Sequence, residues 1–155
     1  MMRPLRHGTL FLACVILVET VLLAPCVLAA EDARQVTVCG IVADPNNLDV
    51  DPKLAQIQPQ LSKLLPKHGF RLIEVKSKRV KGGQSVVCDL GGGYSAEALL
   101  VEPLDENGKV QLKCDLTLNA VSQFSTLVTT PANQLFFCDQ KRGDGTHLLI
   151  AVGAR

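Results

Sequence analysis

The most constraining feature of this 155-residue sequence is an alternation of apolar and polar residues with a period of two. It is clearest over residues 109–118, where valine, leucine and cysteine alternate with lysine, glutamine, aspartate and threonine. Successive side chains of a β-strand point to opposite faces of a sheet. The pattern therefore predicts a strand with one buried and one solvated face, which is typical of antiparallel sheets.

Similar patterns cover most of the chain from residue 70 onward. They predict strands near residues 70–80, 84–90, 94–103, 109–118, 123–130, 134–139 and 146–152. Glycine-rich segments separate several of these strands, and the Asp-Glu-Asn-Gly segment at 105–108 predicts a hairpin turn because Asn-Gly tolerates positive φ. We expect an antiparallel meander that curls into a small sandwich or half-barrel.

The segment before this meander has a different pattern. Residues 36–42 form a continuous apolar run rich in β-branched residues, which predicts a buried strand. Asp51 can cap a following helix, in which leucine and isoleucine recur at helical spacing. Pro59 lacks an amide donor, so we expect a kink or two short helical pieces. With the strand near 70–80, this order predicts a strand–helix–strand (βαβ) opening and an α+β fold class overall.

Residues 1–30 have the three parts of a secretory signal peptide. Arg3 and Arg6 lie near the start, an apolar run follows, and Ala29 and Ala30 supply the small residues of a cleavage site. We therefore expect an exported protein, periplasmic or secreted, with a single α+β domain over residues 31–155. The alternative is an uncleaved anchor, because the apolar segment is long enough to span a bilayer. Contact with a membrane is expected only in that case.

The charge of the predicted domain is balanced. Residues 1–30 contain two of the 16 Lys and Arg residues and one of the 15 Asp and Glu residues, so the remainder carries 14 of each. A dedicated nucleic-acid binder needs a surplus of basic residues to displace counterions from phosphates, so we expect no nucleic acid. A local basic run, Lys76, Lys78, Arg79 and Lys81, is typical of a solvated strand edge.

Four cysteines remain after residue 30, namely Cys39, Cys88, Cys114 and Cys138. In an oxidising compartment an even set of four predicts two disulfides, and the sequence leaves all three connectivities open. The alternative is that they are buried free thiols that pack as small apolar side chains. Structural zinc sites usually take their ligands in close pairs, which are absent here, so we expect no metal and no cofactor.

The segment Gly91-Gly92-Gly93-Tyr94 is a candidate binding loop, since Tyr94 offers an amphipathic contact. The alternative is a plain hairpin tip. The segment lacks the Lys-Ser/Thr and the strand-to-helix setting of a phosphate-binding loop.

No residue is predicted to be catalytic. His68 or His147 could act as a general base beside Ser95, Ser122 or Ser125, but no nucleophile elbow accompanies them. Three aspartates between residues 44 and 51 could supply oxygen ligands, but their spacing misses the EF-hand frame.

The order of these features resembles that of exported bacterial proteins of uncharacterised function. The shared pattern is a signal peptide, a strand–helix–strand unit and a β-rich tail that ends in a strand such as residues 148–152. The opening unit is also similar to the small ring-building domains of bacterial secretion channels. These resemblances imply no catalytic residues. We expect a binding or assembly module whose partner is a protein or envelope component. The alternatives are a small secreted hydrolase and a membrane-tethered subunit of an envelope complex.

Overall fold

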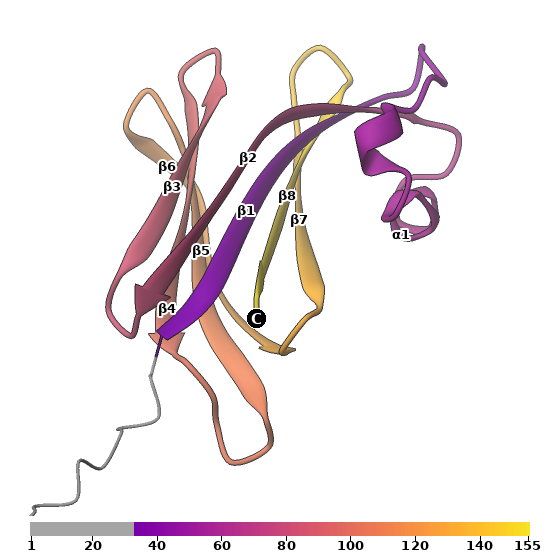
Figure 1. Ribbon diagram of the computed structural model, residues 1–155. Helices are drawn as coiled ribbons and strands as arrows, with labels where there is room; N and C mark the ends of the chain where they lie inside the picture. Colours follow the sequence, from indigo (N-terminus) through magenta and orange to yellow (C-terminus); the bar gives the residue numbers. More distant parts are fainter. Residues whose placement is uncertain (1–32) are drawn as a thin grey trace, which may run out of the picture.

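Two four-stranded antiparallel sheets make up the computed structural model, which describes residues 33–155. The first sheet has the strand order β2-β1-β8-β7 and the second the order β3-β4-β5-β6 (Figure 1). The strands are β1 (Ala33–Asp44), β2 (Gly69–Lys81), β3 (Ser85–Gly91), β4 (Tyr94–Glu102), β5 (Lys109–Leu118), β6 (Val121–Pro131), β7 (Leu135–Lys141) and β8 (His147–Ala154). The proposed signal segment, residues 1–30, lies outside the described residues.

The seven strands predicted from residue 70 onward are all present, and each end lies within two residues of its predicted position. The β-rich sandwich is therefore confirmed. The alternation was informative because each strand of the second sheet faces the first sheet on one side only. On β5, for example, Val110, Leu112, Cys114 and Leu116 are fully buried, whereas Lys109 and Lys113 are exposed.

The opening unit differs from its prediction in strand direction. β1 and β2 pair antiparallel, from Ala33 opposite Lys81 to Asp44 opposite Gly69, so this unit is a long hairpin and not a βαβ crossover. The periodicity of a segment reveals its element type but carries no information on its direction. The connection holds the 3₁₀ helix η1 (Pro52–Leu54) and the helix α1 (Gln58–Leu64), which confirms the two short helical pieces. Neither helix within residues 33–155 is long and apolar enough to cross a membrane.

The main core lies between the two sheets, and we call it the inner core. Its largest contributions come from β3, β4, β5 and β8. Its fully buried aliphatic residues include Val36, Val38, Leu100, Val110, Leu112, Leu116, Ile150 and Val152. Burial of such side chains contributes about 25 cal/mol per Å² of apolar surface removed from water.

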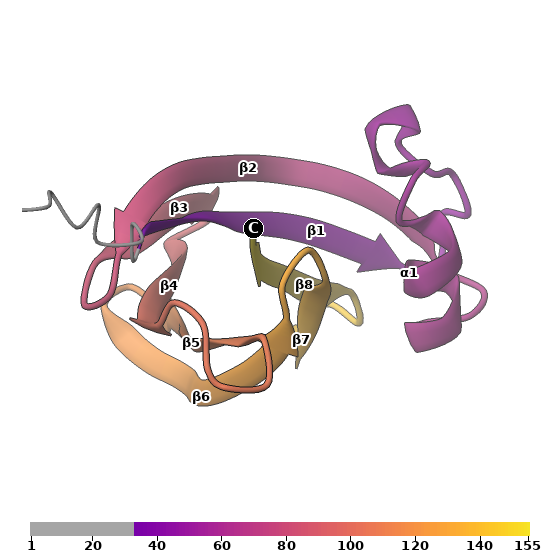
Figure 2. The same cartoon turned by 60° about the horizontal axis from the view of Figure 1, so that its bottom comes forward.

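A second, outer core lies on the opposite face of the first sheet, beneath the helices. Ile41 of β1 and Leu149 of β8 pack there with Phe70, Leu54 and Leu61. Figure 2 shows α1 at one end of this sheet, beside the C-terminal end of β1. Residues 38–43 of β1 and 148–154 of β8 are therefore buried on both faces, which explains why these stretches are continuous apolar runs without alternation.

Candidate binding cleft

The predicted binding loop is a tight hairpin turn between β3 and β4. Gly91 pairs with Tyr94, and the two residues between them, Gly92 and Gly93, have φ angles of 61° and 84°. Positive φ at both central positions is the mark of a type I′ turn, which glycine adopts without steric cost. The backbone amide of Gly91 also donates a 2.9 Å hydrogen bond to Oδ1 of Asp89. The glycines thus hold Tyr94 at the end of the sandwich.

This turn forms one wall of an open cleft of about 310 Å³, which we call the end cleft. The lining comes from β1, β2, β3, β4, β8 and the turn between β7 and β8. It comprises Val42, Arg71, Leu72, Ile73, Leu90, Gly91, Gly92, Tyr94, Arg142 and Leu148. The candidate loop therefore lies in a concave site built by both sheets.

Two arginines carry all the charge of the end cleft. Arg71 of β2 is exposed, and Arg142 of the β7–β8 turn is half-buried. Within residues 33–155 neither guanidinium forms an ion pair with a carboxylate. The guanidinium carbon of Arg142 lies 5.5 Å from the centroid of the Tyr94 ring, a cation–π distance. The end cleft is thus a cationic site with an aromatic wall.

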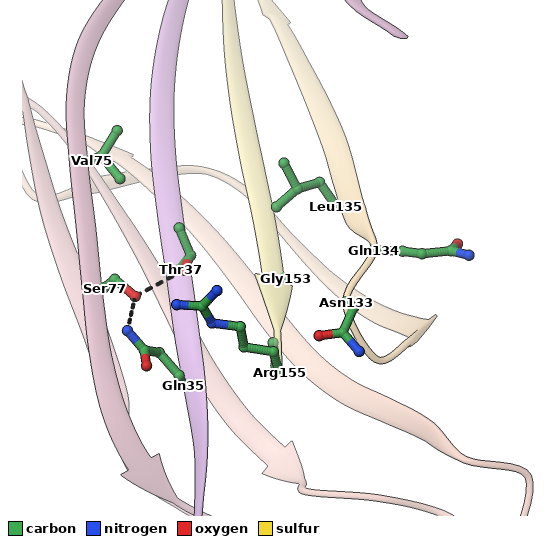
Figure 3. Close-up of a pocket in the computed structure, with 10 residues that line it drawn as sticks. Gln35, Thr37, Val75, Ser77, Asn133, Gln134, Leu135, Gly153 and Arg155 are labelled. Carbon is green, nitrogen blue, oxygen red and sulfur yellow. Dashed lines mark hydrogen bonds between the residues drawn. The ribbon is translucent and has the colours of Figure 1, made fainter. Parts of the chain in front are cut away.

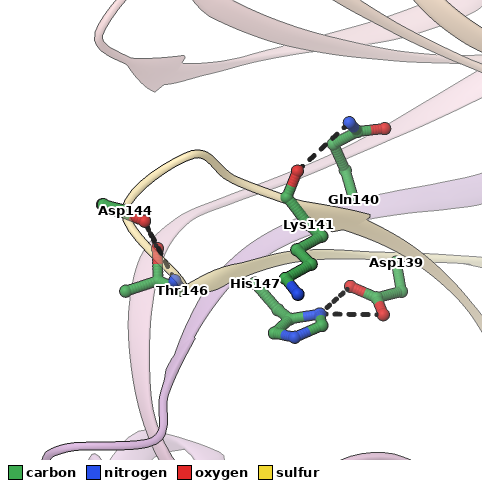
Figure 4. A network of polar contacts seen from close by, with 6 residues as sticks. All are labelled: Asp139, Gln140, Lys141, Asp144, Thr146 and His147. Atoms are coloured by element: carbon green, nitrogen blue, oxygen red, sulfur yellow. Dashed lines mark hydrogen bonds and ion pairs between the residues drawn. The ribbon is translucent and has the colours of Figure 1, made fainter.

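A second pocket of about 260 Å³ adjoins the end cleft and shares Arg71 and Arg142 with it. Three carboxylates also line it, those of Asp44, Asp49 and Asp144. Hydrogen bonds from the Thr146 hydroxyl and amide hold the pKa of Asp144 below its ordinary value, with a smaller contribution from the charge of Arg142. The hydroxyl bond is 2.6 Å long and the amide bond 2.9 Å (Figure 4). The two arginines thus line both the end cleft and a pocket that also contains carboxylates.

The two histidines considered as general bases lie together. Nδ1 of His147 lies 2.8 Å and 3.0 Å from the two carboxylate oxygens of Asp139 (Figure 4). The ring of His68 meets that of His147 edge to face, with the ring centroids 5.6 Å apart. Ser95, Ser122 and Ser125 lie on β4 and β6 of the other sheet, so they do not join this pair. Asp139 was missed in the sequence because only the β7–β8 pairing brings it beside His147.

A larger groove of about 490 Å³ lies on the outer face of the first sheet (Figure 3). Its floor carries a chain of polar contacts: Nε2 of Gln35 donates to Oγ of Ser77 over 3.0 Å, and that hydroxyl lies 2.9 Å from Oγ1 of Thr37. Asn133 and Leu135 line both this groove and a second one beside α1. No local pattern in the sequence marks this surface, because its residues come from β1, β2, β7, β8 and the β6–β7 turn.

All four described cysteines are buried free thiols, so the two predicted disulfides are not formed at bonding distance. Cys114 and Cys138 form a close pair, with their thiols 4.0 Å apart. Cys39 belongs to the outer core, whereas Cys88, Cys114 and Cys138 belong to the inner core. Burial raises the pKa of Cys39 to about 12, with a smaller contribution from Cys88, so its thiol is protonated at neutral pH.

The predicted basic run lies on β2, which is an edge strand of the first sheet. Lys76, Lys78 and Lys81 are exposed there, as expected for a solvated edge. Charged side chains on an edge strand discourage pairing with strands of other molecules. The run therefore has a structural explanation that needs no anionic partner.

The fold and the site together define a β-sandwich with a cationic cleft at one end. Comparison of the chain with protein-family models, with curated proteins and with solved structures finds no match. The proposals below therefore depend on the geometry and chemistry of the chain itself.

Proposed function

We propose that this chain is an exported binding module whose end cleft captures an acidic group, a carboxylate or a phosphate, of a protein or envelope component. The observation that carries the proposal is the placement of Arg71 and Arg142, neither of which forms an ion pair within residues 33–155, in the lining of a cleft walled by Tyr94. A guanidinium is planar and presents a fork of N–H donors that matches a carboxylate or a phosphate.

The shape of the end cleft supports capture of a projecting group in preference to enclosure of a whole small molecule. Its volume of about 310 Å³ is at the lower end of ligand pockets, and the cleft is open to solvent. Leu72, Ile73 and Leu90 line the same cleft as the charged groups. Apolar surroundings strengthen charge-assisted hydrogen bonds by lowering the local dielectric constant.

The binding proposal is preferred to a secreted hydrolase because of the surroundings of His147. Its contacts with Asp139 orient the ring as in a general base, but no serine hydroxyl within residues 33–155 contacts either histidine. A hydrolytic mechanism through an activated serine would need that contact.

Removal of either arginine is expected to weaken binding of an acidic probe by about tenfold or more, because a hydrogen bond to a charged group contributes about 1.5–3 kcal/mol. Isothermal titration with an oligo-glutamate peptide, and separately with inorganic phosphate, measures the effect in Arg71→Ala and Arg142→Ala. Lys109→Ala is the matched control, since it also removes one positive charge but lies in β5 outside the cleft lining. Equal losses in all three variants would point to net charge alone, and the cleft proposal would fail.

Export is expected to yield a mature chain that begins near residue 31. The physical basis is the pair of small residues, Ala29 and Ala30, that follows the apolar run. Small residues at this position form the cleavage site that signal peptidase recognises. Intact-mass measurement of the chain recovered from secretion-competent cells tests this. Recovery of a membrane-bound chain that still contains residues 1–30 would favour the tethered-subunit alternative and reject the cleaved form.

A further inference from the structure

Two thiols from different sheets meet inside the inner core. Cys114 lies in the middle of β5 in the second sheet, and Cys138 lies on β7 in the first sheet. Both are buried, with exposed fractions of 0% and 9%, and their thiols are 4.0 Å apart. Residues 114 and 138 are far apart in the chain, so only the packing of the two sheets brings them together.

We infer that Cys114 and Cys138 form an inter-sheet disulfide in the oxidised protein, while Cys39 and Cys88 remain thiols. This inference goes beyond the proposed binding function. It depends on the export proposal only for the oxidising compartment in which the bond would form.

The other pairings are disfavoured by the faces on which the thiols lie. Cys39 packs in the outer core with Ile41 and Leu61, on the opposite side of its sheet from the three thiols of the inner core. Cys88 lies on β3, an edge strand of the second sheet, and no other described thiol is hydrogen-bonded to it. A second bond would therefore need one of these strands to rearrange.

Formation of the bond requires a small approach of the two sulfur atoms. A disulfide has an S–S length of about 2.05 Å, so the thiols must close the present separation by about 2 Å. In the folded protein the contact between the two thiols lowers the pKa of Cys138 and raises the pKa of Cys114, as expected when one thiol donates a hydrogen bond to the other.

The oxidant we assign is a disulfide, either oxidised glutathione or the disulfide of a thiol oxidoreductase. The thiolate of one of the two cysteines attacks one sulfur of the oxidant, which forms a mixed disulfide and releases one thiolate. The thiolate of the other cysteine then attacks the cysteine sulfur of the mixed disulfide, and the second thiolate of the oxidant leaves. Two protein thiols lose two electrons and two protons, and the oxidant is reduced to two thiols. Because both cysteines are buried in the sandwich, the exchange takes place before the two sheets have closed.

Peptide mapping distinguishes the predicted pair from every other one. Trypsin cleaves after Lys113 and Lys141, and the segment between them has no Lys or Arg, so both thiols fall in the single peptide 114–141. Cys39 and Cys88 fall in the separate peptides 35–53 and 82–109. After blocking of free thiols in denaturant, we expect peptide 114–141 to be unlabelled and lighter by two hydrogen atoms. We expect one label on each of the other two peptides.

The mapping is carried out on the chain recovered from secretion-competent cells and on the full chain refolded in oxidised and reduced glutathione. Two labels on peptide 114–141 after oxidative refolding, or a link that includes Cys39 or Cys88, would overturn the inference. A bond that forms on refolding but not in the recovered chain would leave the pairing intact and count against export instead. The two proposals can therefore fail separately.

A thermal measurement tests whether the bond joins the two sheets of the folded protein. A disulfide that closes this loop is expected to raise Tm by about 10 °C in chain refolded without reductant, relative to chain refolded with it. The same shift is expected in the matched double variant Cys39→Ala/Cys88→Ala. It should be absent in Cys114→Ala/Cys138→Ala, and an undiminished shift in that variant would contradict the assigned pair. The double variants differ in which thiols they keep but not in the number they remove.

Discussion

Replacement of Leu112 by alanine is expected to lower the free energy of unfolding by about 2–5 kcal/mol. Leu112 is fully buried in the middle of β5 and faces the inner core between the two sheets. Its truncation removes apolar contacts and leaves a cavity that the surrounding strands fill only in part. Because the chain has no tryptophan, urea unfolding followed by far-UV circular dichroism is the suitable measurement.

Leu127→Ala is the matched control for this prediction. Leu127 lies on the neighbouring strand β6, but it is 59% exposed on the outer face of the same sheet. Its truncation should change the free energy of unfolding by no more than about 0.5 kcal/mol. Similar losses in the two variants would mean that the inner and outer faces of the second sheet have been assigned incorrectly.

Leu61→Ala is expected to detach α1 from the first sheet. Leu61 is the one buried residue of this seven-residue helix, and it packs in the outer core. A helix this short is unstable in water by itself, so its structure depends on tertiary packing. Loss of the leucine should cost about 2–5 kcal/mol. Hydrogen exchange should show that amide protection falls over residues 52–65 while the strands of the inner core stay protected.

Leu64→Ala tests the specificity of this effect in the same helix. Leu64 is 49% exposed, so its truncation removes little buried surface and should leave the exchange of α1 almost unchanged. If Leu61→Ala instead raised exchange uniformly over all strands, the helix would be part of one cooperative core and not a separately docked element.

The strands illustrate how much of the fold can be predicted from local patterns. β5 is recognisable because it is buried on one face, so its alternation is visible in the sequence. The second half of β1 is recognisable for the opposite reason, since both of its faces are covered and its sequence is continuously apolar. The antiparallel pairing of β1 and β2 was not predictable, because the same two patterns fit strands that run in either direction.

The end cleft illustrates that a local sequence pattern carries no information on which distant residues will line a site. The turn Gly91-Gly92-Gly93-Tyr94 was predicted from its glycines, and the structure places it in a concave site. Arg71 and Arg142, which supply the charge of that site, carry no distinguishing signal in the sequence. They line one site only because the first residues of β2 and the β7–β8 turn lie beside the same hairpin.

By itself, the sequence determined where the strands and turns lie, since apolar periodicity and glycine conformation act over a few neighbouring residues. The tertiary structure alone decided the direction of β1 against β2, the division of the strands into two sheets, the cationic end cleft and the closeness of Cys114 to Cys138. These features depend on the packing of segments that are distant in the chain. A sequence pattern specifies which side chain is to be buried, but the free energy of packing selects the partner that covers it.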